Sequence, residues 1–319
     1  MQQILTLVGP IFCLIGLGFI LARVNYLTPG AGRFLAEFGY KVAVPALLFR
    51  AMSSVRDVPV SPVVLAAAFV ACLFAVWLVT TLAATLILRR SQADSAAIAM
   101  AANFGNGVMF GFPVMLMAYG SDAVAPMAFL ATLETVVLWT FGTLHMEVAS
   151  RSGRGLRIEA FAKVLSSVAQ NPIILALLLG LAWRSTGLGL PAVPARLLGL
   201  LADAAVPVSL FALGVALAGY EVRGQGSVVA LLCAIKLVAF PLLALVLVTS
   251  VFEMPAVWAG VMVLYAAMPV GANAFLFAAK YDRAVASVSA SVAVSTGLAL
   301  VTVTAVLALL QAKGILPAG

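Results

Sequence analysis

The stretch NFGNGVMFGFP, residues Asn103–Pro113, places three glycines and a proline inside an otherwise apolar segment. A second stretch, AAMPVGANAF, residues Ala266–Phe275, again combines proline, glycine and asparagine in apolar surroundings. Glycine weakens a helix through its backbone freedom, and proline removes a backbone donor. Backbone groups freed in this way are costly in hydrocarbon unless protein or water satisfies them. If both stretches cross a membrane, they predict broken helices that line a cavity.

The composition around these stretches indicates that they do cross a membrane. The 319 residues are 64% hydrophobic and 9% charged, against about 45–50% apolar and about 25% charged in a soluble domain. A helical span needs about 20 mostly apolar residues. We therefore predict an all-α integral membrane protein with ten transmembrane helices, in which helices 4 and 9 are broken. The expected spans lie near residues 4–22, 34–53, 61–88, 95–118, 123–147, 162–183, 197–220, 227–250, 256–280 and 285–311.

The basic residues are distributed unevenly between the joints of these spans. Of the eighteen Lys and Arg residues, eleven lie in joints that follow odd-numbered spans and four lie on the opposite side. Basic residues accumulate in cytoplasmic loops. The distribution predicts a multi-pass protein of the cell inner membrane with both termini in the periplasm. The net charge of +7 is then explained by the orientation of the protein in the membrane and does not indicate nucleic-acid binding.

The two halves of the chain resemble each other at a nearly constant offset. Pro10 matches Pro172, and Pro45 matches Pro207, both 162 residues apart. A unit with an odd number of spans enters the membrane from opposite sides in its two copies, so the repeat is predicted to be inverted, as in alternating-access carriers. The expected parts are a first five-helix repeat at 1–149, a basic cytoplasmic linker at 150–161 and a second, inverted five-helix repeat at 162–319.

Paired interruptions at corresponding places in two halves are a strong pointer to a transporter's binding site. The N-terminus of a half-helix carries partial positive charge, which suits a carboxylate. The alternative is that glycine only allows close packing and proline only kinks the helices. Asparagines beside both breaks favour a site. The substrate-binding residues that we expect are Asn103, Asn106, Gly107, Pro113, Pro269, Gly271 and Asn273.

Two ionisable residues lie deep within predicted spans. Glu134 is near the middle of the fifth span, and Lys236 is well inside the eighth. An ionisable residue at that depth is a functional hypothesis by default, so both are candidates for coupling transport to an ion. They could instead form a structural pair, or the lysine could extend to the interface. We expect no metal site or other cofactor, and proton, sodium or no coupling stays open.

Several segments together resemble the auxin efflux carrier family, which includes plant PIN auxin exporters and bacterial permeases for malate, malonate and similar acids. They are residues 9–18, 44–49, 103–113, 170–173, 205–214 and 268–273. The resemblance implies crossed, broken helices 4 and 9, a scaffold from helices 1, 2, 6 and 7, and a transport unit from helices 3–5 and 8–10. It also implies a homodimer and elevator-type motion. Pro113 and Pro269 are 156 residues apart instead of 162, which departs from the repeat.

The sequence therefore predicts a secondary active transporter that moves a small organic anion, such as a malate-, malonate- or auxin-like carboxylate, across the membrane, with membrane lipids around its helices. A passive organic-anion channel is the nearest alternative, because a glycine-rich broken helix can line a pore. An integral membrane enzyme is the alternative from another class. The single histidine and the lack of paired intramembrane carboxylates speak against it. The chain also lacks the phosphate-binding loop of an ATP-driven pump.

Overall fold

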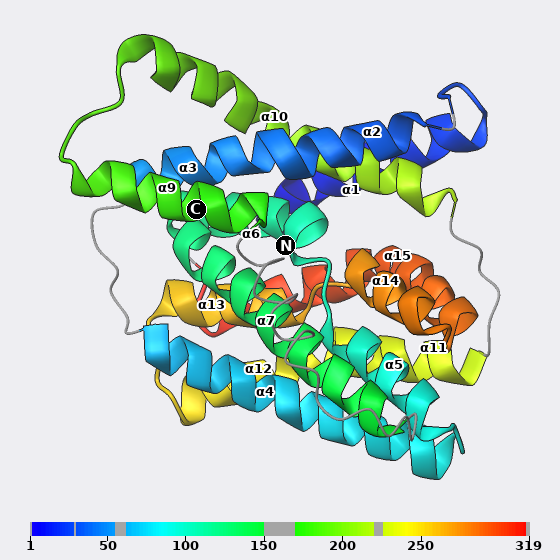
Figure 1. The fold of residues 1–319 in the computed structure, drawn as a ribbon. Helices are drawn as coiled ribbons and strands as arrows, with labels where there is room; N and C mark the ends of the chain where they lie inside the picture. The colour runs from blue at the N-terminus through cyan, green and yellow to red at the C-terminus, as the bar shows by residue number, and fades with distance from the viewer. Residues whose placement is uncertain (1, 29, 55–61, 150–169, 220–225, 317–319) are drawn as a thin grey trace.

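The computed structural model describes residues 2–28, 30–54, 62–149, 170–219 and 226–316, and these residues form helices joined by short connections (Figure 1). The predicted linker at 150–161 and the beginning of the predicted sixth span, 162–169, lie outside the described residues. The first half contains α1 (Gln2–Arg23), α2 (Ala31–Phe38), η1 (Gly39–Ala43), α3 (Val44–Ser54), α4 (Pro62–Leu82), η2 (Ala83–Ile87), α5 (Gln92–Asn103), η3 (Gly107–Gly111), α6 (Phe112–Tyr119), η4 (Gly120–Ala123) and α7 (Val124–Ala149). The second half contains α9 (Pro172–Ser185), α10 (Ala192–Leu217), α11 (Gly226–Ala234), η5 (Ile235–Ala239), α12 (Phe240–Ser250), α13 (Ala256–Ala266), α14 (Ala272–Tyr281) and α15 (Val285–Ala312).

The described helices have the length and apolarity of a membrane protein. Five helical stretches are long and apolar enough to cross a bilayer: Pro62–Ile87, Gly107–Ala149, Ala192–Leu217, Gly226–Ser250 and Val285–Ala312. Shorter apolar helices cover Gly9–Arg23, Pro172–Ser185 and Ala256–Ala266. The prediction of an all-helical fold is therefore confirmed for the described residues, and the length and apolarity of these helices are consistent with a membrane protein. The stretch Gly107–Ala149 contains a turn at Gly120, whose φ of 62° favours glycine.

Short π-helical segments join neighbouring α-helices into longer elements. Segment η1 connects α2 to α3, η3 precedes α6, and η5 connects α11 to α12. Such segments are often found at functional sites. Here η3 begins directly after the interruption that follows α5, and η5 carries the buried Lys236.

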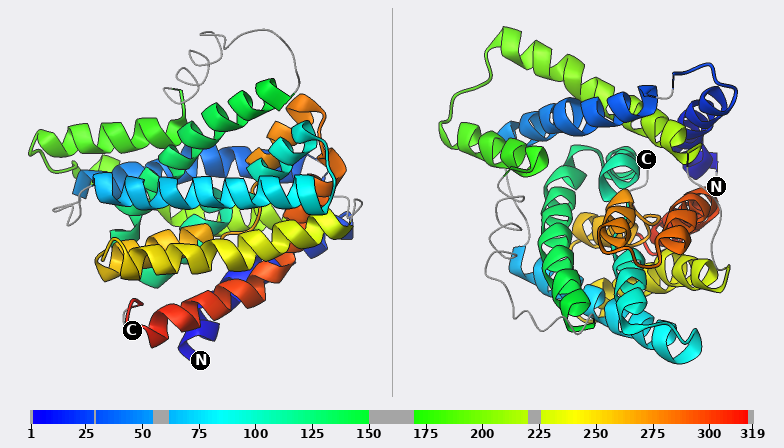
Figure 2. Two further views of the ribbon diagram at one scale, coloured as in Figure 1. Left: turned by 90° about the horizontal axis from the view of Figure 1, so that it is seen from below. Right: turned by 45° about the vertical axis from the view of Figure 1, so that its right-hand side comes forward.

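The helices are arranged in two layers. Helices α1, α2, α3, α9 and α10 form one layer, at the top of Figure 1, whereas α4, α5, α7 and α11–α15 form the other. The two further views show the same separation, with α6 between the layers (Figure 2). In the first layer α1 packs against α10, and α3 packs against α9.

Glycines bring the backbones of these two helix pairs into contact. A Cβ atom on Gly18 of α1 would clash with the carbonyl oxygen of Phe211 on α10. A Cβ atom on Gly180 of α9 would lie 2.8 Å from the carbonyl oxygen of Phe49 on α3. Both glycines therefore permit helix packing at backbone distance.

Both predicted interruptions are present. Helix α5 ends at Asn103 and the chain resumes a helical path at Gly107. Helix α13 ends at Ala266, and α14 starts at Ala272. Pro113, however, does not lie in the break: it is the second residue of α6, directly after the π-helical segment η3 that resumes the helical path at Gly107. Pro113 and Pro269 thus occupy different structural positions.

Candidate functional site at the crossing of the two breaks

The two breaks meet and pair with each other as short extended segments. Gly105 and Val270 form an antiparallel bridge. The N–H of Asn106 donates to the carbonyl of Pro269 at 2.8 Å, and the N–H of Gly271 donates to the carbonyl of Phe104 at 2.9 Å. The interrupted backbones therefore satisfy part of each other's hydrogen bonding inside the protein, as an apolar environment requires.

Glycine is needed where the two backbones approach. A Cβ atom on Gly271 would lie 2.5 Å from the oxygen and 2.8 Å from the carbonyl carbon of Gly105. A Cβ atom on Gly107 would lie 2.5 Å from the ring of Tyr265. These glycines are thus positions of close approach, which explains their occurrence in the two sequence stretches.

Side chains from three helices form further hydrogen bonds around the crossing. The Gly105 N–H donates to Oε1 of Glu134, on α7, at 3.2 Å. The Tyr265 hydroxyl, on α13, donates to Oε2 of the same carboxylate at 2.8 Å. On α15, Oγ of Ser295 accepts from the N–H of Val270 at 3.0 Å. Glu134 therefore connects both breaks, one through the backbone and the other through the tyrosine of α13.

Lys236 contacts the same peptide segment. Its side chain is fully buried, and Nζ donates to the carbonyl of Asn103 at 3.1 Å. That carbonyl belongs to the last residue of α5, where the negative end of the helix dipole favours a cation. Nζ also lies 4.4 Å from the ring centroid of Phe240. Glu134 and Lys236 form no ion pair within 4 Å, and each makes a hydrogen bond to the segment 103–105.

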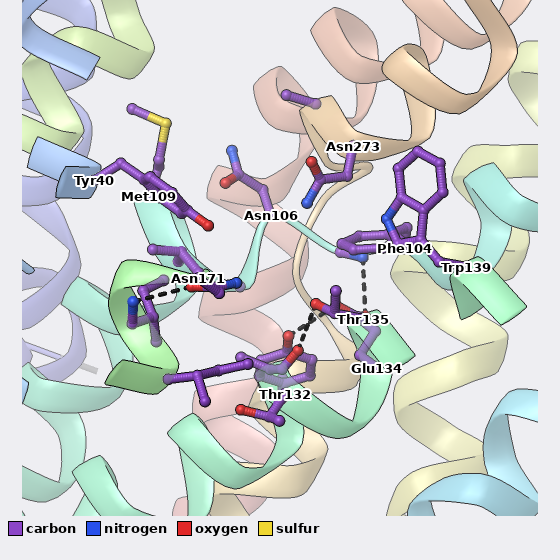
Figure 3. A pocket seen from close by; sticks show the side chains of 18 of the residues that line it. Tyr40, Phe104, Asn106, Met109, Thr132, Glu134, Thr135, Trp139, Asn171 and Asn273 are labelled. Carbon is purple, nitrogen blue, oxygen red and sulfur yellow. Dashed lines mark hydrogen bonds between the residues drawn. The ribbon is translucent and has the colours of Figure 1, made fainter. Parts of the chain in front are cut away.

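A cavity of about 780 Å³ lies between the two helix layers and reaches the crossing (Figure 3). Its size is within the range of small-molecule sites. The first layer contributes Ala36, Tyr40, Asn171, Ile173 and Ile174 to its wall. The breaks and the second layer contribute residues 104–109, Ala131, Thr132, Glu134, Thr135, Trp139, Thr143, Glu147, Tyr265, Ala272, Asn273, Lys280 and Tyr281.

The first turns of both half-helices line this cavity. Gly107, Val108 and Met109 open the helix after the first break, and Ala272 and Asn273 open the helix after the second. The first N–H groups of a helix have no intrahelical acceptor. Two sets of such donors, each at the positive end of a helix dipole, therefore border one space that can hold an anion.

The cavity brings together some of the residues expected from the sequence and leaves out others. Asn106, Gly107 and Asn273 line it, together with the coupling candidate Glu134 (Figure 3). Pro269 and Gly271 are not lining residues, and they act in the pairing of the breaks. Pro113 and Lys236 also lie outside the lining.

Asn103 is placed differently from the expectation. Its side chain is fully buried, and its amide donates to the carbonyl of Ala99 at 2.9 Å, within α5. The side chain therefore belongs to the end of the helix and not to the cavity wall. The reason is helical geometry, because a side chain in the last turn leans back toward the N-terminus of its helix.

Sequence reasoning did not single out Tyr265 or Ser295. The serine could have been found, because Ser287, Ser291 and Ser295 recur every four residues in an apolar span and so mark one polar face of a helix. All three are buried. Tyr265 carries no comparable signal, since an aromatic residue in an apolar span is ordinary.

Comparison with known proteins identifies the family of this chain. The model of the family described as "Membrane transport protein", the auxin efflux carrier family, matches residues 3–307. The chain belongs to this family. It is 30% identical over 321 aligned positions to a protein of Rhizobium meliloti (strain 1021) named "Putative malonate transporter", covering 100% of this chain and 99% of that one. It is 27% identical to an "Uncharacterized transporter" of Methanothermobacter thermautotrophicus, covering 92% and 93% of the two chains.

Membership of the auxin efflux carrier family gives the crossing a functional context. The protein is a multi-pass membrane transporter, as the family and the apolar helices together indicate. The crossing and its cavity, which stand at the junction of the two layers, are its candidate substrate site.

Proposed function

We propose that this auxin efflux carrier family protein is a secondary active transporter for a small organic anion, whose carboxylate binds at the crossing. The observation that carries the proposal is the convergence of two half-helix N-termini on one cavity. Asn106 and Asn273 add side-chain amides that can donate to the same carboxylate. Charge-assisted hydrogen bonds of this kind contribute about 1.5–3 kcal/mol each.

A malonate- or malate-like acid is the first substrate class to test. The support comes from the relative named as a malonate transporter, which matches this chain over its whole length. An auxin-like carboxylate is the second class, because the cavity wall also contains the aromatic side chains of Tyr40, Phe104 and Trp139.

An elevator-type movement of one layer against the other would provide alternating access. The two-layer arrangement supports this, with α1–α3, α9 and α10 as the scaffold and the helices that carry the crossing as the transport unit. The cavity lies where the two units meet, so a displacement of the transport unit would carry the bound anion along the scaffold.

The inverted five-helix repeat is supported by equivalent contacts in the scaffold. Gly18 approaches the carbonyl of Phe211, and Gly180 approaches the carbonyl of Phe49. Gly18 and Gly180 are 162 residues apart, and so are Phe49 and Phe211. The same pair of positions therefore packs in the same way in both halves, with the roles of the halves exchanged.

The cavity opens toward the side that the basic residues assign to the cytoplasm. Ala36, Glu147 and Tyr281 line it at helix ends next to joints of the basic side. In the proposed inner-membrane orientation, with periplasmic termini, the structure is thus the cytoplasm-facing state. Lipids surround the helices, and a homodimer is the proposed assembly, which cross-linking in membranes can test.

Counterflow in proteoliposomes tests the function. Vesicles loaded with unlabelled malonate, malate or a monocarboxylate should take up the labelled acid with saturation and trans-stimulation, with or without proton and sodium gradients. A passive channel would conduct without trans-stimulation. Absence of flux for every carboxylate in a folded, reconstituted protein would refute the proposal.

A further inference from the structure

A second group of polar and charged side chains lines the cavity away from the crossing. Lys280, Tyr281, Trp139, Thr143 and Glu147 come from the C-terminal parts of α14 and α7. Lys280 is exposed, whereas Glu147 is half-buried. This group forms the mouth of the cavity, since both helices end at the side with the basic joints.

The Lys280 ammonium is held by aromatic rings. Its Nζ lies 5.4 Å from the ring centroid of Trp139 and 5.1 Å from that of Tyr281. The Tyr281 hydroxyl in turn donates to Oγ1 of Thr143 at 3.3 Å, which fixes one of these rings to α7. Among the described residues, no carboxylate lies within 4 Å of Nζ. The cation is therefore positioned in the cavity without being neutralised by a direct ion pair.

Lys280 lies nearer the mouth of the cavity than the crossing does. It follows Asn273 by seven residues on α14, which places it on the same helix face, two turns further on. At 1.5 Å per residue, the separation along the helix is about 10 Å. The two side chains leave the helix two turns apart, so an anion that enters from the mouth meets Lys280 before it meets Asn273.

We propose that Lys280, supported by Trp139 and Tyr281, forms a vestibule site that attracts small organic anions from the cytoplasm before they reach the crossing. This inference rests on the proposed function, because it needs the crossing to be the final anion site. A positive charge at the entrance of a low-dielectric cavity raises the local anion concentration and the rate of entry. Glu147, in the same mouth, acts against this attraction.

The test compares initial rates of carboxylate transport from the cytoplasmic face, using malonate as the probe in inside-out vesicles. Lys280→Gln should raise KM three- to tenfold with little change in the maximal rate, and Lys280→Arg should keep KM near the wild-type value. Glu147→Gln should lower KM. The effect of Lys280→Gln should shrink at high salt, because ions screen the attraction.

Lys313→Gln is the matched control, since it removes the same charge at the C-terminal end of α15, outside the cavity lining. Asn273→Ala separates failure of this inference from failure of the proposed function. If Asn273→Ala weakens transport and Lys280→Gln behaves like Lys313→Gln, the vestibule site is refuted and the crossing stands. If neither the wild type nor any variant transports a carboxylate, the proposed function itself fails.

Discussion

At the scale of single residues, the asparagines of the breaks are the most direct test of the anion site. Asn106 ends the first break, and Asn273 is the second residue of α14, so both present amides to the cavity. Asn103, only three residues earlier, bonds within its own helix instead. Neighbouring residues of one type thus have different roles because the backbone direction changes between them.

Replacing Asn106 or Asn273 by Ala should weaken substrate binding about tenfold or more. The loss of one charge-assisted hydrogen bond exceeds 1.4 kcal/mol, which is a factor of ten in affinity. Stability should change less, because water can replace a cavity-lining amide. Binding isotherms and thermal melts of purified variants provide the measurement. Unchanged affinity in both variants would contradict the site.

Glu134 is the ionisable residue of the crossing whose charge a bound anion would affect most directly. It lines the cavity and accepts hydrogen bonds from the Gly105 N–H and the Tyr265 hydroxyl. A carboxylate substrate nearby would repel it unless a proton accompanied the anion. This geometry fits the expectation that Glu134 couples transport to an ion.

Glu134→Gln should therefore preserve counterflow while abolishing accumulation driven by a proton gradient. Glutamine keeps the volume and can still accept a hydrogen bond from Tyr265, so the variant should fold. Thr135→Ala, in the same cavity wall, is the control for a general disturbance. Gradient-driven uptake equal to that of the wild type would assign Glu134 a structural role.

At the scale of elements, the crossing depends on backbone pairing between the two interrupted segments. The positions of the breaks could be predicted from sequence, because glycine and proline mark them directly. Their mutual pairing could not, since Asn106 and Pro269 meet only through the tertiary fold. The position of Pro113 has the same origin: a proline in the sequence does not specify whether it lies in a break, as Pro269 does, or in the helix that follows one, as Pro113 does.

Gly271→Ala should separate the two breaks and abolish transport. The added Cβ would lie 2.5 Å from the Gly105 oxygen, so one backbone must move. Overpacking of this kind costs about 1–3 kcal/mol, which should also lower the melting temperature. Gly297→Ala, in α15, is the matched control because a Cβ there meets nothing within 4 Å. Equal activity and stability of the two variants would show that the crossing tolerates expansion.

At the scale of the whole molecule, orientation decides which side of the membrane the cavity serves. Composition and basic residues suffice to predict a helical membrane protein and the sidedness of its joints. The division into a scaffold and a transport unit is implied only by the family resemblance, because no periodicity specifies which helix packs against which. Figure 2 shows the two layers of helices.

Fusion of a periplasm-dependent reporter after Gly319 should give an active reporter, and fusion at the basic joint near Arg89 should not. We expect the eleven basic residues of that side to retain it in the cytoplasm. An inactive Gly319 fusion together with an active Arg89 fusion would reverse the orientation. It would also turn the cavity mouth, and with it Lys280, toward the periplasm.

The ring of Trp139 in the cavity wall has a further consequence. Of the four tryptophans in the chain, it is the one that lines this cavity; Trp77 instead donates to Nδ1 of His145 at 3.0 Å. Indole emission responds to the polarity and charge around the ring, and here Lys280 lies over its face. Trp139 is thus an intrinsic fluorescence probe, so an anion that arrives at the mouth can be detected by a change in tryptophan emission without attaching a dye.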